Sequence, residues 1–511
     1  MSIVDRRRVH APPPASATIE ALRGLGYSLG AAIADLIDNS IAAGAGNVWI
    51  TAHWSGKDSF IAILDDGRGM SSAELIDVLR LGRPGPGVER SPSDLGRFGL
   101  GLKTASFSQA RRVTVASRRN SAEGDAFCWD LDHVAQRDEW ELLQGAAEGS
   151  ARHLTALEDM ESGTIVLLEL LDRVVPTVEA SDPMAHSHFL RQLAGVEEHL
   201  AMVFHRFLDG TTPDLRLFVN GRDDSHRVRA WDPFLSRHPA TIATPIERMN
   251  AHRGSVEVQG FVLPHRRRLD EAAFAKAGGP HGWTAQQGFY VYRNRRLLLP
   301  GSWLALGGTR AWTKEEPYKL ARLRLDIPNT ADSDWRIDVR KSLADPPDQI
   351  RPRLRDLASY VRDTARRVFA FRGSAAPTED SAVTYVWLPA PIGRTNQVHY
   401  KINREHPAVQ LVTEQHRDLK DAVEGMLRTI EQNVPVQRIW VDAIERGEIG
   451  DRADPAAVKS ALDIIFAEMI RDGRMSARDA KHQLLMIEPF HKYPELIAEL
   501  DESTEGGALD A

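Results

Sequence analysis

Asp35 and Asn39 have the side-chain types and the spacing needed to hold a metal ion and to activate a water molecule. They lie four positions apart in the segment ADLIDNS, residues 34–40. On a helix such residues sit one above the other, ~6 Å apart along the axis. An amide oxygen suits Mg²⁺, and a nearby carboxylate can orient and deprotonate water that attacks a γ-phosphate. The alternative is an exposed polar stripe on a surface helix.

Asp65 follows the apolar strand residues 61–64, where a charge is costly unless another group satisfies it. A carboxylate there can accept the exocyclic amine of adenine and so select ATP over GTP. Gly67 and Gly69 allow the backbone to turn closely against the base. A strand-end turn in which aspartate is only a local hydrogen-bonding group is the competing interpretation.

A glycine-rich segment supplies the third part of the pattern, with Gly96, Gly99 and Gly101 just before the helix-compatible residues 102–109. Backbone N–H groups at such a helix start bind phosphates, and Lys103 adds a positive charge. The spacing is not that of a P-loop, and the segment does not follow a first strand as a dinucleotide fold requires. Together the three segments predict a pocket for a nucleotide and its magnesium ion.

These residues need a mixed α/β framework to bring them together. The apolar spacing predicts a helix over 29–41, ended by Gly44 and Gly46. A second helix over 72–81 has Ser71 or Ser72 as its cap and Glu74 placed for a capping box. Residues 82–97 are rich in Gly, Pro, Ser and charge, which indicates a mobile loop. Strands are expected at 47–52, 60–64, 112–116, 127–131 and 164–169.

A helical stretch over 186–207 leads to a second α/β region, which a long amphipathic helix at 347–371 closes. Residues 373–381 are small and polar and form a plausible boundary. The strands of the second region are expected at 214–219, 254–258, 288–292 and 320–326, and the helices beyond the boundary at 414–430, 435–445, 455–472 and 476–487.

The composition is that of an ordinary globular chain, with 511 residues, 42% hydrophobic and 26% charged. A net charge of -7 gives no whole-chain argument for nucleic-acid binding, although a local basic patch stays open. No segment approaches the ~20 apolar residues of a membrane span, so we expect a cytoplasmic protein without a membrane partner.

The order of these motifs resembles the GHKL ATPases, the superfamily of DNA gyrase B, heat-shock-90 chaperones, histidine kinases and MutL. The resemblance covers residues 18–370 and implies a Bergerat fold, with ATP and Mg²⁺ as ligands and residues 82–97 as the lid. It implies that Asp35 is the general base and that Asn39 is the magnesium ligand. The other nucleotide-binding positions that it implies are Asp65, Gly67, Gly69, Met70, Gly99, Leu100, Gly101, Leu102, Lys103 and Thr164.

One departure from the family concerns the base, which is usually Glu in gyrase, MutL and the chaperones but is the shorter Asp35 here. The enzyme is therefore expected to be a slow ATPase that forms ADP and phosphate. Residues 288–297 resemble the transducer domain of MORC-type ATPases and their bacterial relatives. That domain carries a lysine that reaches the nucleotide, which maps best to Lys341, with Lys314 and Lys319 as alternatives.

The expected fold class is α+β: a Bergerat-fold α/β sandwich, a ribosomal-protein-like βαβ transducer domain and a helical C-terminal domain. The expected boundaries are a flexible arm at 1–17, the GHKL domain at 18–175, the transducer domain at 176–372, a linker at 373–381, a mainly helical domain at 382–500 and a disordered tail at 501–511.

The resemblance implies an ATP-gated homodimeric clamp that acts in DNA manipulation or anti-phage defence, beside a helicase or nuclease. The basic clusters at residues 265–268 and 293–296 either contact DNA phosphates or are solvated loops. The alternative function is that of a heat-shock-90-like chaperone acting on protein clients. A histidine kinase fits poorly, because no dimerising helix with a phosphoacceptor precedes the domain, and no topoisomerase cleavage domain is evident.

Overall fold

The computed structural model describes most of the chain, which divides into two compact units, residues 1–373 and 374–511. Within them the described residues are 13–81, 101–122, 124–175, 178–251, 254–328, 335, 344–370, 383–391, 398–415, 419–435, 454–471 and 475–500. The lid predicted at 82–97, together with Gly99, Leu100 and Lys341, lies outside them.

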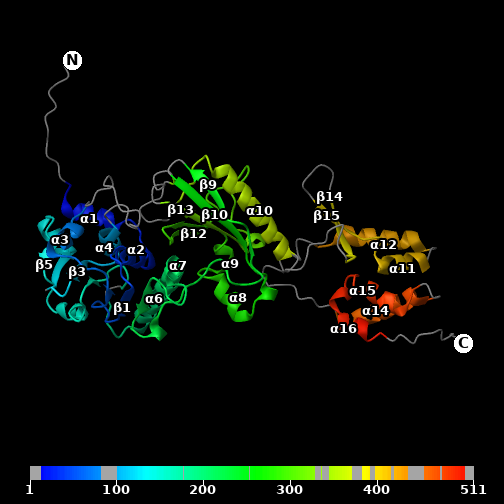
Figure 1. The fold of residues 1–511 in the computed structure, drawn as a ribbon, viewed down its shortest axis with the longest axis horizontal. Helices are drawn as coiled ribbons and strands as arrows, with labels where there is room; N and C mark the ends of the chain where they lie inside the picture. The colour runs from blue at the N-terminus through cyan, green and yellow to red at the C-terminus, as the bar shows by residue number, and fades with distance from the viewer. Residues whose placement is uncertain are drawn as a thin grey trace, which may run out of the picture. The chain divides into compact units, whose positions relative to one another are not determined.

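The first unit begins with a mixed, mostly antiparallel sheet (Figure 1). In the described residues it has seven strands in the spatial order β5-β4-β3-β6-β2-β1-β7, and only β1 and β7 pair in parallel. Its strands are β1 (Asn47–His53), β2 (Phe60–Asp65), β3 (Arg112–Arg118), β4 (Asp125–Asp130), β5 (Leu143–Gln144), β6 (Gly163–Glu169) and β7 (Arg216–Val219).

Helices cover one face of this sheet and build the main core with it. Alternate residues of each strand, such as Ile61 and Ile63 of β2, pack beneath the helices. Asp65, the last residue of β2, lies two positions after Ile63 and therefore faces the helical layer as well. The helices of this part are α1 (Ala15–Arg23), α2 (Leu29–Ala42), α3 (Ser72–Leu79), α4 (Gly101–Phe107), α5 (Leu131–Arg137), α6 (Pro183–Val203) and α7 (His205–Leu208).

Local sequence signals set the limits of the two helices that flank the predicted site. Ser28 caps α2 by accepting a hydrogen bond from the Ala31 N–H. Ser71 and Glu74 form the predicted capping box at the start of α3. The predictions of α2, α3, β1 and β2 are confirmed within a few residues at their ends.

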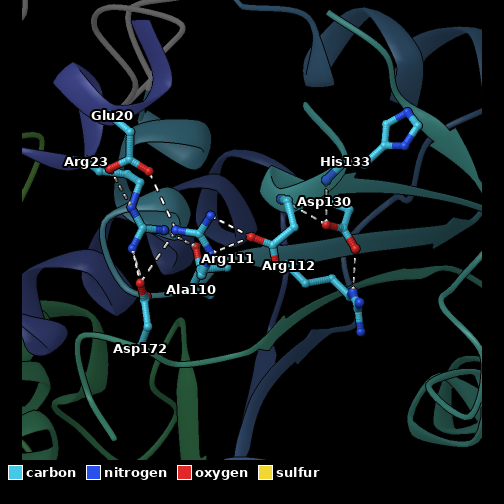
Figure 2. A network of polar contacts seen from close by, with 9 residues as sticks. Glu20, Arg23, Ala110, Arg111, Arg112, Asp130, His133 and Asp172 are labelled. Atoms are coloured by element: carbon cyan, nitrogen blue, oxygen red, sulfur yellow. Dashed lines mark hydrogen bonds and ion pairs between the residues drawn. The ribbon is translucent and has the colours of Figure 1, made fainter. Parts of the chain in front are cut away.

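Helix α1 is held to the sheet by a polar network around a buried arginine (Figure 2). The guanidinium of Arg23 donates to the Ala110 carbonyl at 3.1 Å and to the Asp172 carboxylate at 2.8 and 2.5 Å. Arg111 extends the network through Glu20, Asp172 and Asp132. Residues 15–17 were predicted to belong to a flexible arm, but they form the first turn of α1, because Ala15 and Ile19 pack into the core.

Strand β7 lies in the first sheet and not in the second region, where the sequence placed it. It pairs in parallel with β1, in the register Val48 to Leu217. Parallel strands need a crossover connection, which α6 and α7 provide here. Pairing between strands so distant in sequence leaves no local signal, so the prediction was wrong at this point.

The second sheet of the first unit has six strands among the described residues, in the order β12-β11-β13-β10-β8 with β9 paired to β10. Its core includes Val258, Val291 and Leu325 and packs against α10 (Arg351–Ala370). The remaining elements are β8 (Ile242–Ala243), β9 (Glu247–Ala251), β10 (Gly254–Val262), α8 (Glu271–Gly278), α9 (Gly282–Ala285), β11 (Gly288–Arg293), β12 (Arg296–Ser302) and β13 (Ala321–Ile327).

The second unit combines helices with a two-stranded sheet that the sequence did not predict. Strands β14 and β15 pair antiparallel, in the register Trp387 to Ile402. The described elements are β14 (Trp387–Pro391), β15 (Val398–Ile402), α11 (Pro407–Gln415), α12 (Lys420–Asn433), α14 (Pro455–Ile470), α15 (Ala477–Leu484) and α16 (Pro494–Ala498). Throughout the described part of the chain, no helix has the length and apolar character needed to cross a bilayer.

Candidate functional site

Helix α2 presents the predicted base and metal ligand from one helical face. Asp35 is almost buried, with 8% of its surface exposed, whereas Asn39 is exposed. The Asn39 side-chain amide donates to the Asp35 carbonyl at 3.0 Å, as expected for residues one turn apart. The pair therefore combines a shielded carboxylate with an amide oxygen that solvent can reach.

Both carboxylate oxygens of Asp35 are hydrogen-bonded. The Tyr27 hydroxyl donates to Oδ2 at 3.2 Å, and Nη2 of Arg296 donates to Oδ1 at 3.3 Å. Burial and the charge of Asp35 raise the pKa of Tyr27, so this hydroxyl keeps its proton and acts as a donor. These two donors approach the carboxylate of Asp35 from different elements, the segment that precedes α2 on one side and β12 on the other.

Arg296 was not identified from the sequence as part of the site. It comes from β12 in the second sheet, and its Nε lies 3.2 Å from both oxygens of the buried Asp38. Both interpretations of the 293–296 cluster, a DNA contact and a solvated loop, need exposed side chains, and both are wrong for Arg293 and Arg296, which are 3% and 5% exposed. A buried pair of carboxylates needs a cation as a partner. The acids Asp35 and Asp38, three positions apart on α2, were therefore the signal in the sequence that an arginine belongs to the site.

Asp65 ends β2 on the helix-covered face, at the C-terminal end of α2. Ser40 Oγ donates to its Oδ2 at 2.8 Å, and the Gly67 N–H donates to its Oδ1 at 2.9 Å. Burial raises the pKa of Asp65, and these two hydrogen bonds oppose that effect. A desolvated carboxylate with lone pairs remaining is a suitable acceptor for an amine of a planar base. Ser40 is a neighbour that the sequence analysis did not name.

The adjacent Asp66 has a different role. Its Oδ1 accepts the N–H groups of Gly46 and Asn47 at 2.8 Å each, and its Oδ2 accepts the Asn47 side chain at 2.7 Å. These bonds fix the connection between α2 and β1. Only the first aspartate of the Asp-Asp-Gly sequence therefore faces the site.

The turn after Asp65 needs its glycines. A Cβ on Gly67 would lie 2.8 Å from Ala43 Cβ and 2.9 Å from Asp65 Oδ1. Gly69 has φ +66°, and a Cβ there would lie 1.8 Å from the Arg118 carbonyl oxygen. The backbone thus passes directly along the carboxylate of Asp65.

Ser117 connects the turn to β6. It accepts the Met70 N–H at 2.9 Å, donates to the Gly163 carbonyl at 3.0 Å and lies 2.9 Å from Thr164 Oγ1. Thr164 is paired with Asp65 in the register of β2 and β6, and with Ser117 in that of β3 and β6. The predicted residues Asp65, Met70 and Thr164 therefore lie together at one end of three neighbouring strands, with Ser117 as an additional member.

Helix α4 begins beside the predicted base: a Cβ on Gly101 would lie 3.9 Å from Asp35 Oδ2. Leu102 follows and packs against the core. Lys103 is 2% exposed and donates to the Val78 and Arg80 carbonyls at 2.8 Å each, at the C-terminal end of α3. Burial lowers its pKa to about 8. In this structure the ammonium of Lys103 therefore holds α3 and α4 together.

The arrangement fits a magnesium nucleotide. Asp65 and the glycine turn suit a purine, the start of α4 suits phosphates, and Asn39 offers an oxygen on the same helix as the base. Among the described residues no three His, Cys, Asp or Glu side chains form a cluster of metal ligands. Mg²⁺ usually keeps several waters and takes further ligands from phosphates, so a single protein oxygen such as that of Asn39 is a sufficient contact.

Comparison with known families agrees with this geometry. Residues 27–164 match the family of histidine kinase-, DNA gyrase B- and HSP90-like ATPases. The match begins at Tyr27 and ends at Thr164, so it includes α2, the glycine turn and α4. This part of the chain is a GHKL-type ATPase domain, which implies ATP binding and hydrolysis. A search among curated proteins finds no match for the chain.

Proposed function

We propose that this protein binds Mg-ATP at the site between α2, the Asp65 turn and α4, and hydrolyses it slowly. The observation that carries the proposal is the buried Asp65 carboxylate, which lies at the strand end inside a matched ATPase domain and faces the same helix as Asp35 and Asn39. Asp65 would accept the adenine amine, and Asn39 would hold the magnesium ion.

Asp35 is the residue proposed to accept the proton of the attacking water. Its carboxylate is fixed by Tyr27 and Arg296 and borders the start of α4, where the phosphates are expected. Asp is one methylene shorter than Glu, which supports slow turnover. Lys341 is proposed to contact the γ-phosphate, with Lys314 and Lys319 as alternatives.

The proposed biological role is an ATP-gated dimeric clamp of MORC-like type, acting in DNA manipulation or anti-phage defence with a helicase or nuclease partner. The contact between Arg296 of the second sheet and α2 supports it, because this contact couples the ATPase domain to the next region. The exposed residues Arg266, Arg267 and Arg268 are a candidate contact for DNA phosphates.

Titration calorimetry with Mg-ATP and Mg-GTP, combined with phosphate release, tests the ATPase proposal. We expect saturable binding of Mg-ATP in preference to Mg-GTP, and slow release of phosphate. Absence of Mg-ATP binding would remove the proposal.

The clamp is tested by light scattering with and without a non-hydrolysable ATP analogue, and by binding of double-stranded DNA at several salt concentrations. We expect ATP-dependent dimers and DNA affinity that falls steeply with salt. Dimers without DNA binding would favour the chaperone-like alternative with protein clients.

A further inference from the structure

Arg296 joins the second sheet to two acidic residues of α2. Its side chain is 6% exposed, and those of Asp35 and Asp38 are 8% and 5% exposed. The two carboxylates lie about one helical turn apart and share this one guanidinium. Removal of the arginine would take away a cation that contacts both of these nearly buried carboxylates, so the contact affects more than the packing of the two regions.

Most of the guanidinium is fixed by groups other than Asp35. Nε contacts Asp38 at 3.2 Å, and Nη1 donates to the Leu297 carbonyl at 2.7 Å. The guanidinium carbon lies 5.8 Å from the centroid of the Phe204 ring. These contacts set the plane of the group and direct Nη2 to Asp35 Oδ1 at 3.3 Å.

The other oxygen of Asp35 is set from a different side, by the hydroxyl of Tyr27 at 3.2 Å. Two donors on the two oxygens fix the rotation of the carboxylate about its last bond. The orientation of a short aspartate base matters because a misplacement of about 1 Å can cost ~100-fold in rate. Neither donor lies at Asp65 or at the side chain of Asn39, where nucleotide and metal are expected.

We propose that Arg296 is a positioning residue that orients Asp35 for hydrolysis and contributes little to nucleotide binding. The inference rests on the proposed ATPase function. Asp38 is then the anchor that holds Arg296 in place, and the second sheet acts on turnover through this side chain.

The test compares Arg296→Met and Arg296→Lys with wild type in the full-length protein. We expect Arg296→Met to lower kcat by about 10- to 100-fold while the Kd for Mg-ATP stays within about threefold. Arg296→Lys should restore part of kcat, because the charge returns without the fork that contacts both carboxylates. Arg248→Met is the matched control, an arginine of the same sheet that is 76% exposed and paired with Glu257, and its kcat should equal wild type.

Each further outcome has a defined meaning. Wild-type turnover in Arg296→Met overturns the inference alone, whereas no turnover in wild-type protein ends the proposed function and the inference with it. If Arg296→Met does not fold, Arg296→Lys decides: a reduced kcat at unchanged Kd supports the inference, and an unchanged kcat overturns it. In an Asp35→Asn background the Lys variant should cause no further loss of residual turnover, and a further loss of equal size would show that Arg296 does not act through Asp35.

Discussion

Nη2 of Arg296 lies 3.3 Å from Oδ1 of Asp35, although 261 positions separate the two residues in the chain. The contact places the second sheet in direct touch with the proposed general base. His199 of α6 lies nearby and packs against Gly30 of α2. Burial and the charge of Arg296 lower the pKa of His199 to about 4, so this imidazole is neutral at neutral pH and adds no second cation.

Asn39→Ala should abolish Mg-ATP binding in calorimetry, because the variant removes the oxygen proposed to bind magnesium. The fold should be retained, since Asn39 is exposed and its side-chain amide donates to the Asp35 carbonyl of its own helix. Asn433→Ala is the matched control: Asn433 is also exposed and donates to a carbonyl four residues earlier, at 2.8 Å. Tight Mg-ATP binding by the Asn39 variant would remove this residue from the site.

Asp65→Asn should weaken ATP binding by about 10- to 100-fold, the loss expected for one hydrogen bond to a charged acceptor. Asp66→Asn is the control, because the carboxylate of Asp66 accepts hydrogen bonds from Gly46 and Asn47 at the start of β1. This variant should lower stability and leave the ATP affinity close to wild type. Equal effects of the two variants on affinity would show that Asp65 does not recognise adenine.

The stability of Asp65→Asn should also depend on pH in a different way from that of the wild-type protein. Burial raises the pKa of Asp65 above 3.8, so the folded protein binds more protons than the unfolded chain just above that pH. The contribution of Asp65 to the free energy of unfolding therefore falls as pH rises through this window, and Asp65→Asn should lack that fall. Urea denaturation at several acidic pH values measures it.

Lys103→Met should lower the free energy of unfolding by about 1–3 kcal/mol, because the Val78 and Arg80 carbonyls lose their donor. The pKa of Lys103 is lowered from 10.5 to about 8, so between these values the unfolded chain binds more protons than the folded one. The free energy of unfolding of the wild-type protein should therefore rise as pH increases from 8. Lys103→Met lacks this rise, so the difference in stability between the two proteins should widen. Denaturation below and above pH 8 checks this, and a deficit that narrows would contradict it.

Gly69→Ala should destabilise the ATPase domain by more than about 2 kcal/mol, because its Cβ would overlap the Arg118 carbonyl oxygen. Gly44→Ala separates this clash from backbone strain, since Gly44 has φ +76° and nothing lies within 4 Å of its Cβ position. Gly44→Ala should lower the free energy of unfolding by only about 1 kcal/mol. Thermal unfolding of both variants tests the difference, and equal losses would show that the clash is relieved by small shifts.

Local patterns predicted much of the ATPase domain. The 3.6-residue spacing located α2, short strand-like runs separated by a Ser-Gly-Lys-Asp turn located β1 and β2, and Ser71 with Glu74 located the start of α3. Asp65 could be recognised because a charge after four apolar strand residues needs a partner. These signals lie within a few residues of one another, which is why the sequence carries them.

Contacts between distant segments could not be predicted in this way. The parallel pairing of β7 with β1 depends on a crossover of more than a hundred residues, and β7 was placed in the wrong sheet. From the sequence, Arg296 was interpreted as a surface charge, because its partners Asp35 and Asp38 lie in a distant part of the chain. The side chain of Lys103 was expected at the phosphates, and only the structure shows its two carbonyl partners at the end of α3.

The most direct test of the central claim is a paired measurement on Asp35→Asn, which keeps the size of the side chain and removes its charge. Arg296 retains Asp38 as a partner, so the variant should fold. We predict that the Kd for Mg-ATP stays within about threefold of wild type while phosphate release falls by about 100-fold or more. Phosphate release at the wild-type rate would show that Asp35 is not the base, and loss of nucleotide binding together with turnover would contradict the division of roles proposed for α2.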